Sequence, residues 1–273
     1  MKKFTFFALA AALLCVGCDK NENGNGGKEP EDPTKLVYGG VTYNLVTLAD
    51  GNTWMAENLR YVPEGKTVSA DPTVATGVWY PYTFDGTDCV AATDEESVSK
   101  YGLLYNAATA FGVDGITADN AASLAGTQGI CPDGWHIPTF DELLNLVGKA
   151  SKLSAAAVGS WEMGSTPENK DAVFYNVDYD GGKISEINES GFNFVFCGMR
   201  NGAGAGSYTK PVAAYPTMPM TYVWGSTVYN TAATTIQFMS LMSTATATYA
   251  DGRLTVAFNN NTNGCAVRCV KNK

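Results

Sequence analysis

The sequence predicts an α+β fold with short twisted antiparallel strands, two main helices and long loops. An alternating apolar and polar stretch near the start predicts strands, and a capped amphipathic stretch in the middle predicts a helix. Only 16% of the 273 residues are charged, against roughly 25% in a typical soluble domain. Gly, Thr, Asn, Ser and Tyr fill the difference. This composition favours short strands and hydrogen-bonded loops on an extracellular scaffold over a helical protein.

The first strands are expected over residues 36–59. Apolar and polar residues alternate there, the chain turns at "ADGN", and the alternation resumes, which is the pattern of a β-hairpin. Later, "GFNFVFCG" (191–198) and "CAVRCVK" (265–271) are apolar enough to predict buried strands. "MTYVWGST" (220–227) also alternates like a strand, which favours a core position for its tryptophan, Trp224.

Two stretches have the period of an amphipathic helix. The first is "SKYGLLYNAATAFG" (99–112), which ends at a glycine and would place on one face Tyr101, Leu104, Tyr105 and Ala108. The second, "PTFDELLNLVGKA" (138–150), is the clearest helix. Thr139 caps it and Glu142 reaches back to the cap, forming a capping box. Its buried stripe would consist of Phe140, Leu143, Leu144 and Val147.

The start of the chain reads as a secretion and anchoring signal. Two lysines and a short apolar run make residues 1–17 a signal peptide, and the ending "CVGC" resembles a bacterial lipobox that lipidates Cys18. An ordinary cleaved signal peptide is the alternative. Residues 18–35 offer almost no apolar side chains for a core, and we expect them to form a flexible tether. The remaining residues, 36–273, are expected to form one domain. The expected location is the outer membrane at the cell surface, with lipid as the membrane contact.

The charge excludes one class of partner. The formal net charge is −9, and it becomes −11 once two lysines leave with the signal peptide. Phosphate contacts need clustered Lys and Arg, which this chain lacks, so nucleic acid is not an expected partner.

Residues 129–146, "GICPDGWHIPTFDELLNL", combine the reactive residue types of a thiol hydrolase or a zinc site. They hold the one histidine, His136, together with Cys131, Asp141 and Glu142. The two carboxylates, however, occupy the first turn of the predicted helix, where negative charge is favoured without any catalytic role. Cys131 lies well before the helix cap, and an oxidising compartment makes a disulfide its expected fate. A structural interpretation is therefore favoured over a catalytic one.

The mature chain keeps five further cysteines, an odd number: Cys89, Cys131, Cys197, Cys265 and Cys269. On an extended strand, Cys265 and Cys269 would lie on the same face with their sulfurs roughly 13 Å apart, too far for a disulfide with each other. A zinc site formed by Cys131, His136, Cys265 and Cys269 is an alternative, but it lacks the close-spaced ligand pairs of zinc modules. The sequence does not give the pairing of Cys89, Cys197 and Cys265.

Five separated motifs resemble the Fibrobacter succinogenes major paralogous domain, found in secreted proteins and lipoproteins of Bacteroidetes and related bacteria. They are "WMAENLRY" (54–61), "YGLLYN" (101–106), "CPDGWHIPTFDELLNL" (131–146), "GFNFVFCGMRN" (191–201) and "AVRCVKN" (266–272). The resemblance implies a C-type lectin-like fold. It also implies a disulfide between Cys131 and Cys269 that closes the domain. Cys197 departs from the usual pattern.

Fold alone does not settle function. The calcium-binding sugar motifs of C-type lectins are absent from the sequence, and Asp178 with Asp180 favours a β-turn over a calcium site. The segment 198–230 is rich in glycine, proline and aromatic residues, which suit sugars, peptides and proteins alike. Possible ligand-binding residues within it are Arg200, Asn201, Tyr208, Tyr215 and Tyr222.

These observations predict a non-enzymatic surface module for adhesion or for binding a glycan or protein ligand, without a cofactor or metal. A structural subunit of a surface assembly is the alternative. A thiol oxidase similar to formylglycine-generating enzymes is a further alternative, because Cys265 and Cys269 superficially resemble its redox pair. Their spacing differs from that of the family by one residue, and one histidine leaves little for general acid–base chemistry.

Overall fold

The computed structural model describes residues 32–85, 88–150, 168–178, 181–202, 220–231, 235–244 and 252–273. The described chain begins with one strand, which is followed by the predicted hairpin. The strands are β1 (Lys35–Tyr38), β2 (Val41–Thr47) and β3 (Thr53–Met55), paired antiparallel in sequence order. Gly51, at φ 78°, makes the turn between β2 and β3, and its N–H donates to the Leu48 carbonyl. The hairpin prediction is confirmed.

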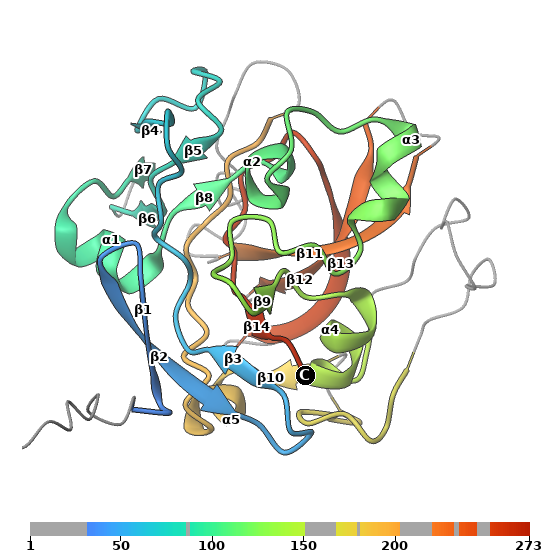
Figure 1. The fold of residues 1–273 in the computed structure, drawn as a ribbon. Helices are drawn as coiled ribbons and strands as arrows, with labels where there is room; N and C mark the ends of the chain where they lie inside the picture. The colour runs from blue at the N-terminus through green and yellow to red at the C-terminus, as the bar shows by residue number, and fades with distance from the viewer. Residues whose placement is uncertain are drawn as a thin grey trace, which may run out of the picture. The chain divides into compact units, whose positions relative to one another are not determined.

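The end of the chain joins the same sheet (Figure 1). β14 (Val270–Lys271) lies between β3 and β9 (Trp135–His136), giving the order β1-β2-β3-β14-β9. Both pairings of β14 are antiparallel. The last residues of the chain therefore lie beside the first hairpin, and the described chain from Asp32 to Lys273 forms one unit.

A second antiparallel sheet has the order β10-β13-β12-β11. Its strands are β10 (Gly182–Lys183), β11 (Met220–Asn230), β12 (Gln237–Thr244) and β13 (Arg253–Asn260). β11 covers the predicted strand and fully buries Trp224, as expected. Two small sheets complete the β structure. One joins β4 (Val68–Ser69), β5 (Val78–Trp79) and β8 (Leu104–Tyr105), and the other joins β6 (Tyr82–Phe84) and β7 (Cys89–Ala91).

The predicted central helix is α4 (Phe140–Val147), and its capping box is present. The Thr139 side chain accepts from the Glu142 N–H, while the Glu142 carboxylate accepts from the Thr139 N–H. The buried stripe consists of Phe140, Leu143, Leu146 and Val147. Leu144, predicted in that stripe, is half-buried at its edge and packs against the same core cluster.

The predicted helix over 99–112 is wrong, because the chain there breaks into three elements. α1 (Glu95–Tyr101) stops at Gly102, where φ is 76°. Leu104 and Tyr105 then form β8, and Asn106 caps a new helix, α2 (Ala107–Phe111), which ends at the predicted Gly112. The backbone groups of Tyr105 pair with Cys265, and this tertiary pairing outweighs the local helical period. The remaining helices are also short: α3 (Ala118–Ala121), the 3-10 turn η1 (Ala122–Leu124) and α5 (Ile184–Glu189).

The predicted strand over 191–198 is also wrong, although its aromatic residues are largely buried. Side chains hold its backbone in place of a strand partner. Asn188 accepts from the Phe194 N–H and donates to the Phe194 carbonyl, while Arg268 donates to the carbonyls of Phe192 and Asn193. Over 265–271, only β14 is a regular strand, preceded by isolated bridges at Cys265 and Ala266.

The alternation predicted for that last segment is nevertheless real. Cys265, Val267 and Cys269 belong to one buried hydrophobic cluster, and Ala266 and Val270 belong to the other. The final segment thus runs between the two halves of the core. Within the described chain, the protein is a mixed α+β, sheet-rich domain with short helices, none of which is long and apolar enough to cross a membrane.

Candidate functional site

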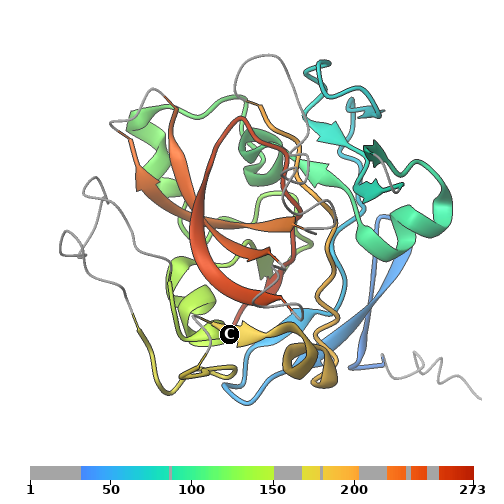
Figure 2. The same ribbon diagram turned by 180° about the vertical axis from the view of Figure 1, so that it is seen from behind.

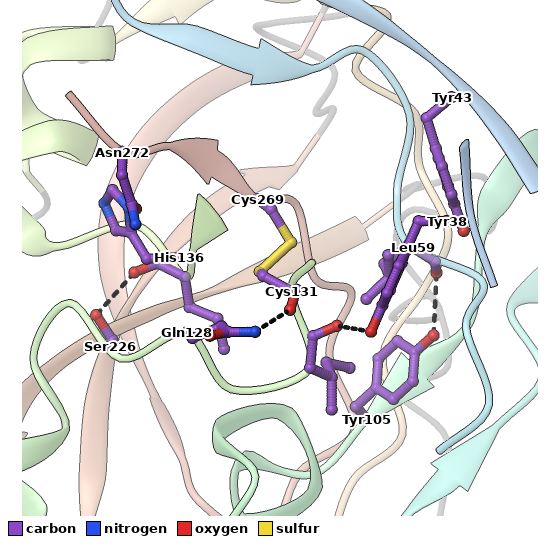
Figure 3. Close-up of a disulfide and its surroundings, with 12 residues drawn as sticks. Tyr38, Tyr43, Leu59, Tyr105, Gln128, Cys131, His136, Ser226, Cys269 and Asn272 are labelled. Carbon is purple, nitrogen blue, oxygen red and sulfur yellow. Dashed lines mark hydrogen bonds between the residues drawn. A yellow bond between two sulfur atoms is a disulfide. The ribbon is translucent and has the colours of Figure 1, made fainter. Parts of the chain in front are cut away.

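The stretch around the single histidine is held by a disulfide (Figure 3). Cys131 and Cys269 are bonded, with their Cα atoms 5.9 Å apart, and both side chains are buried. The bond joins residues separated by 138 positions. Gly134, at φ 79°, makes the turn that directs Trp135 and Ile137 into the core. The disulfide that the family resemblance implied is confirmed.

His136 bridges α4 and the end of the chain. Its Nε2 lies 2.9 Å from Oε2 of Glu142, and its Nδ1 lies 2.7 Å from Oδ1 of Asn272. The hydrogen bond to Glu142 raises the pKa of His136, against the opposing effect of burial. Burial raises the pKa of Glu142, but hydrogen bonds from His136 and Thr139 outweigh it, so that this pKa is lowered. When His136 is protonated, this contact is an ion pair between β9 and the first turn of α4.

The other cysteines of this core are equally inaccessible. Cys197 and Cys265 are free thiols with no exposed surface. Burial raises the pKa of Cys197 to about 11 and that of Cys265 well above its usual value. The zinc alternative is wrong, because the sulfurs of Cys131 and Cys269 are bonded to each other. No group of three or more His, Cys, Asp or Glu residues suited to a metal occurs in the described part of the chain.

Arg200, a predicted ligand-binding residue, lies mostly inside the protein. Its side chain is 8% exposed and its guanidinium lies 4.3 Å from the ring centre of Trp79. Its Nε donates to the Pro72 carbonyl at 2.8 Å, and its Nη1 donates to the Thr262 carbonyl at 3.0 Å. Arg200 therefore connects three separate parts of the chain and satisfies loop carbonyls, while its predicted contact with a ligand stays a prediction.

The residues on both sides of 203–219 are hydrogen-bonded to the rest of the domain; we call residues 198–202 and the start of β11 the base of this segment. The Gly198 N–H donates to the Met220 carbonyl at 2.9 Å, and the Gly202 N–H donates to the Asn263 side chain at 2.8 Å. Asn201 and Tyr222 belong to this base and are half-buried. Tyr208 and Tyr215 belong to the intervening stretch 203–219, which lies outside the described residues. Cys18 and Asp180, elsewhere in the chain, also lie outside them. Asp178, the other half of the considered calcium pair, is exposed.

A buried polar centre was missed by the sequence reasoning. The fully buried Arg268 donates from Nε and Nη2 to Oδ1 of Asn58, at 3.2 and 2.9 Å, and its guanidinium lies 4.6 Å from the ring centre of Phe192. Burial lowers the pKa of Arg268 to about 10. Both residues lie within motifs quoted above, but a pattern of residue types does not tell which polar side chains turn inward.

Residues 49–271 match the family model of the Fibrobacter succinogenes major domain. No curated protein and no solved structure matches the chain.

Proposed function

We propose that this chain, which belongs to the Fibrobacter succinogenes major domain family, is a cell-surface lipoprotein that acts as a non-enzymatic module for adhesion or for binding a glycan or protein ligand. The observation that carries the proposal is the hydrogen-bonded base on both sides of residues 203–219. Connecting segments mounted on a fixed scaffold are common places for binding residues. The segment supplies Tyr208 and Tyr215, and the base supplies Tyr222.

A C-type lectin-like arrangement is part of the proposal. Two features support it: the last strand lies beside the first hairpin, and a disulfide ties the final segment to the chain before α4. In such an arrangement the two chain ends are adjacent, and long connections between other strands are left to carry ligand contacts.

The non-enzymatic part rests on the state of the reactive side chains. Cys269 is engaged in a disulfide, and burial raises the pKa of Cys265, so neither has the character of a nucleophilic thiolate. Both nitrogens of His136 contact protein side chains. Alkylation of the native chain without reductant should leave Cys197 and Cys265 unlabelled. Rapid labelling of Cys265 would instead favour the thiol-oxidase alternative.

The anchor is tested in cells by fatty-acid labelling. Cys18→Ala should abolish incorporation of the label, because Cys18 is the proposed lipid-bearing residue, and it should shift the chain from the membrane to the soluble fraction. Cys15→Ala is the matched control and should be labelled normally. Unchanged labelling of Cys18→Ala would contradict the anchor.

The ligand is tested with the full chain on glycan and host-protein arrays, in a detergent without a sugar headgroup. Tyr208→Ala and Tyr215→Ala should each weaken binding of the retained ligand at least tenfold, within the usual range for aromatic anchors. Tyr175→Ala, in another surface region, is the control. If Tyr208→Ala and Tyr215→Ala bind the ligand as tightly as the Tyr175→Ala control, the proposed binding surface at 203–219 is contradicted. A chain that binds no array ligand but co-purifies with one defined surface protein would favour the structural-subunit alternative.

A further inference from the structure

A cavity of about 320 Å³ opens beside α2, on the side of the small sheet formed by β4, β5 and β8. In Figures 1 and 2 these elements lie in the upper part of the domain, while β14 and the C-terminus lie in the lower part. The residues that line the cavity all belong to described segments: 63–66, 75–77, 106–114 and Ile130. The cavity is therefore distinct from the base around residues 203–219, and a site here goes beyond the function proposed above.

The cavity floor depends on a glycine, Gly77, which has no side chain to fill the space. Gly77 has φ 82°, and a Cβ there would lie 2.3 Å from Oγ1 of Thr109 and 3.5 Å from Oδ1 of Asn106. Ala75, Ala108 and Gly112 also line the space, so small residues keep it open. The floor is fixed in place, because the Asn106 N–H donates to the Gly77 carbonyl at 3.1 Å.

One wall is held from behind by residues that do not line the cavity. Arg200 donates to the Pro72 carbonyl, and Trp79 Nε1 donates to the Val74 carbonyl at 3.0 Å. Val74 immediately precedes Ala75 at the cavity edge, and Pro72 lies in the same loop, before Thr73. The buried stack of Arg200 on Trp79 thus fixes the loop that forms this wall, so the cavity is formed before any ligand arrives.

The floor presents polar groups with spare hydrogen-bonding capacity. Oδ1 of Asn106 accepts from the Thr109 N–H at 2.9 Å, which orients the amide. Within the described residues, Nδ2 of Asn106 and the hydroxyl of Thr109 have no hydrogen-bond partner. Thr109 is 7% exposed as a whole residue, and its hydroxyl is not among the buried polar atoms without a partner, so this group is accessible from the cavity. Lys66 and Asp114 are exposed at the cavity mouth.

We infer that this cavity binds a neutral saccharide of one or two sugar units. The floor offers an amide donor and a hydroxyl, which match the alternating donors and acceptors of sugar hydroxyls. One cation and one anion at the mouth cancel in charge, which disfavours phosphates and polyanions, and a single carboxylate is too little for a divalent cation. The volume falls at the lower end of the range for small-ligand sites.

Apolar contacts complete the fit. Pro63, Val113 and Ile130 line the same cavity and suit the C–H faces of a sugar ring. Behind Ile130 lies an aromatic pair, Tyr38 and Tyr61, with ring centres 4.7 Å apart. The hydroxyl of Tyr38, which is labelled in Figure 3, donates to the Ile130 carbonyl at 3.1 Å, so this half-buried pair supports a residue of the cavity lining.

The test screens the full chain against arrayed neutral oligosaccharides, sialylated and sulfated oligosaccharides, and peptides, followed by titration of the retained sugar. Asp114→Asn should weaken binding of the neutral sugar at least tenfold, because the Asp114 carboxylate in the cavity lining is the charged acceptor offered to the sugar hydroxyls. Ala108→Phe should abolish binding by filling the cavity. If Ala108→Phe does not fold, Ala75→Trp at an exposed position replaces it. Asp119→Asn, an exposed acid on α3, is the matched control and should bind normally.

The outcomes separate this cavity from the segment 203–219. Loss in the cavity variants with normal binding by Tyr208→Ala and Tyr215→Ala supports the cavity. Loss in the tyrosine variants alone overturns it while leaving the proposed function intact. Retention of only anionic glycans or only peptides, or of no array ligand, also overturns the inference.

Discussion

The Cys131–Cys269 region and the α2 cavity make opposite use of polar side chains. In the first region, Cys131 and Cys269 form a disulfide, and both ring nitrogens of His136 contact protein side chains. At the cavity, an amide nitrogen and a hydroxyl have no partner among the described residues, although Thr109 is nearly buried. The first region holds the more reactive residue types, and the second holds the unused hydrogen-bonding capacity.

These two regions show that residue type is a poor guide to a binding site when the environment of the side chain is unknown. Cysteine, histidine and glutamate form a closed network when each satisfies its neighbours, and such a network stabilises without leaving a group for a ligand. An ordinary asparagine and threonine become candidates for binding once a glycine leaves space in front of them. The comparison predicts large stability effects at the disulfide region and large binding effects at the cavity.

Removing the disulfide should give the largest stability effect. The bond closes a loop of about 140 residues, for which chain-entropy arguments give roughly 5 kcal/mol as an upper figure. Cys131→Ala combined with Cys269→Ala should therefore sharply lower the free energy of unfolding measured in denaturant. Sugar affinity should survive under conditions where the variant is folded. Non-reducing peptide mapping of the wild type checks the bond, and an alkylated Cys131 there would contradict it.

Replacing Arg200 should lower both the stability of the protein and the sugar affinity of the cavity. Arg200→Met keeps the apolar stem but leaves the carbonyls of Pro72 and Thr262 without their charged donor, which should cost about 2 kcal/mol. Because the loop before Ala75 loses its support, sugar affinity at the cavity should fall as well. Arg200→Lys retains the charge but not the planar fork, and should show an intermediate loss in both measurements. Wild-type sugar affinity in Arg200→Met would show that the wall needs no such support.

Local features of the fold could be predicted from the sequence because their causes are local. The capping box at Thr139, the turn at Gly51 and the alternation at Cys265, Val267 and Cys269 each depend on a few neighbouring residues. The disulfide was reached through family resemblance, since spacing alone leaves several pairings open. The long helix over 99–112 failed because Tyr105 pairs with Cys265, a partner that no local period reveals.

The cavity could not be predicted for the same reason. Its floor joins Gly77 to Asn106 and Thr109, and its wall depends on Arg200, far away in the sequence. From the sequence, Arg200 was predicted as a possible ligand-binding residue. The carbonyl contacts are seen, and its ligand contact stays a prediction. Only the fold shows that the residue lies behind a cavity wall.

The helix cap offers a smaller, well-defined test of the disulfide region. Thr139→Ala removes the side-chain oxygen that accepts from the Glu142 N–H and should reduce the free energy of unfolding by about 1 kcal/mol. Thr139→Ser retains the oxygen and is the matched control. Equal denaturation midpoints for the alanine and serine variants would indicate that the cap contributes little.

The smallest effect should come from His136, and its signature is pH dependence. The raised pKa of His136 means that its contribution is complete below the ordinary value of 6.5 and is lost as pH rises through the folded-state pKa. The lowered pKa of Glu142 means that its contribution is complete above the ordinary value of 4.5 and is lost as pH falls through the folded-state pKa. Both contributions are present together between about pH 4.5 and 6.5.

His136→Gln should therefore destabilise the protein most within that window, by less than about 1 kcal/mol for a partly exposed pair, and progressively less above it. Denaturation midpoints of wild type and variant across pH 4 to 9 give the difference curve, in which titrations elsewhere in the chain largely cancel. A flat difference would show that His136 has the same pKa in the folded and unfolded protein, which would contradict a stabilising ion pair with Glu142. Because the glutamine leaves the α2 cavity untouched, sugar affinity at each pH should be the same in both proteins, and a loss of binding in this variant alone would move the functional site back to the histidine.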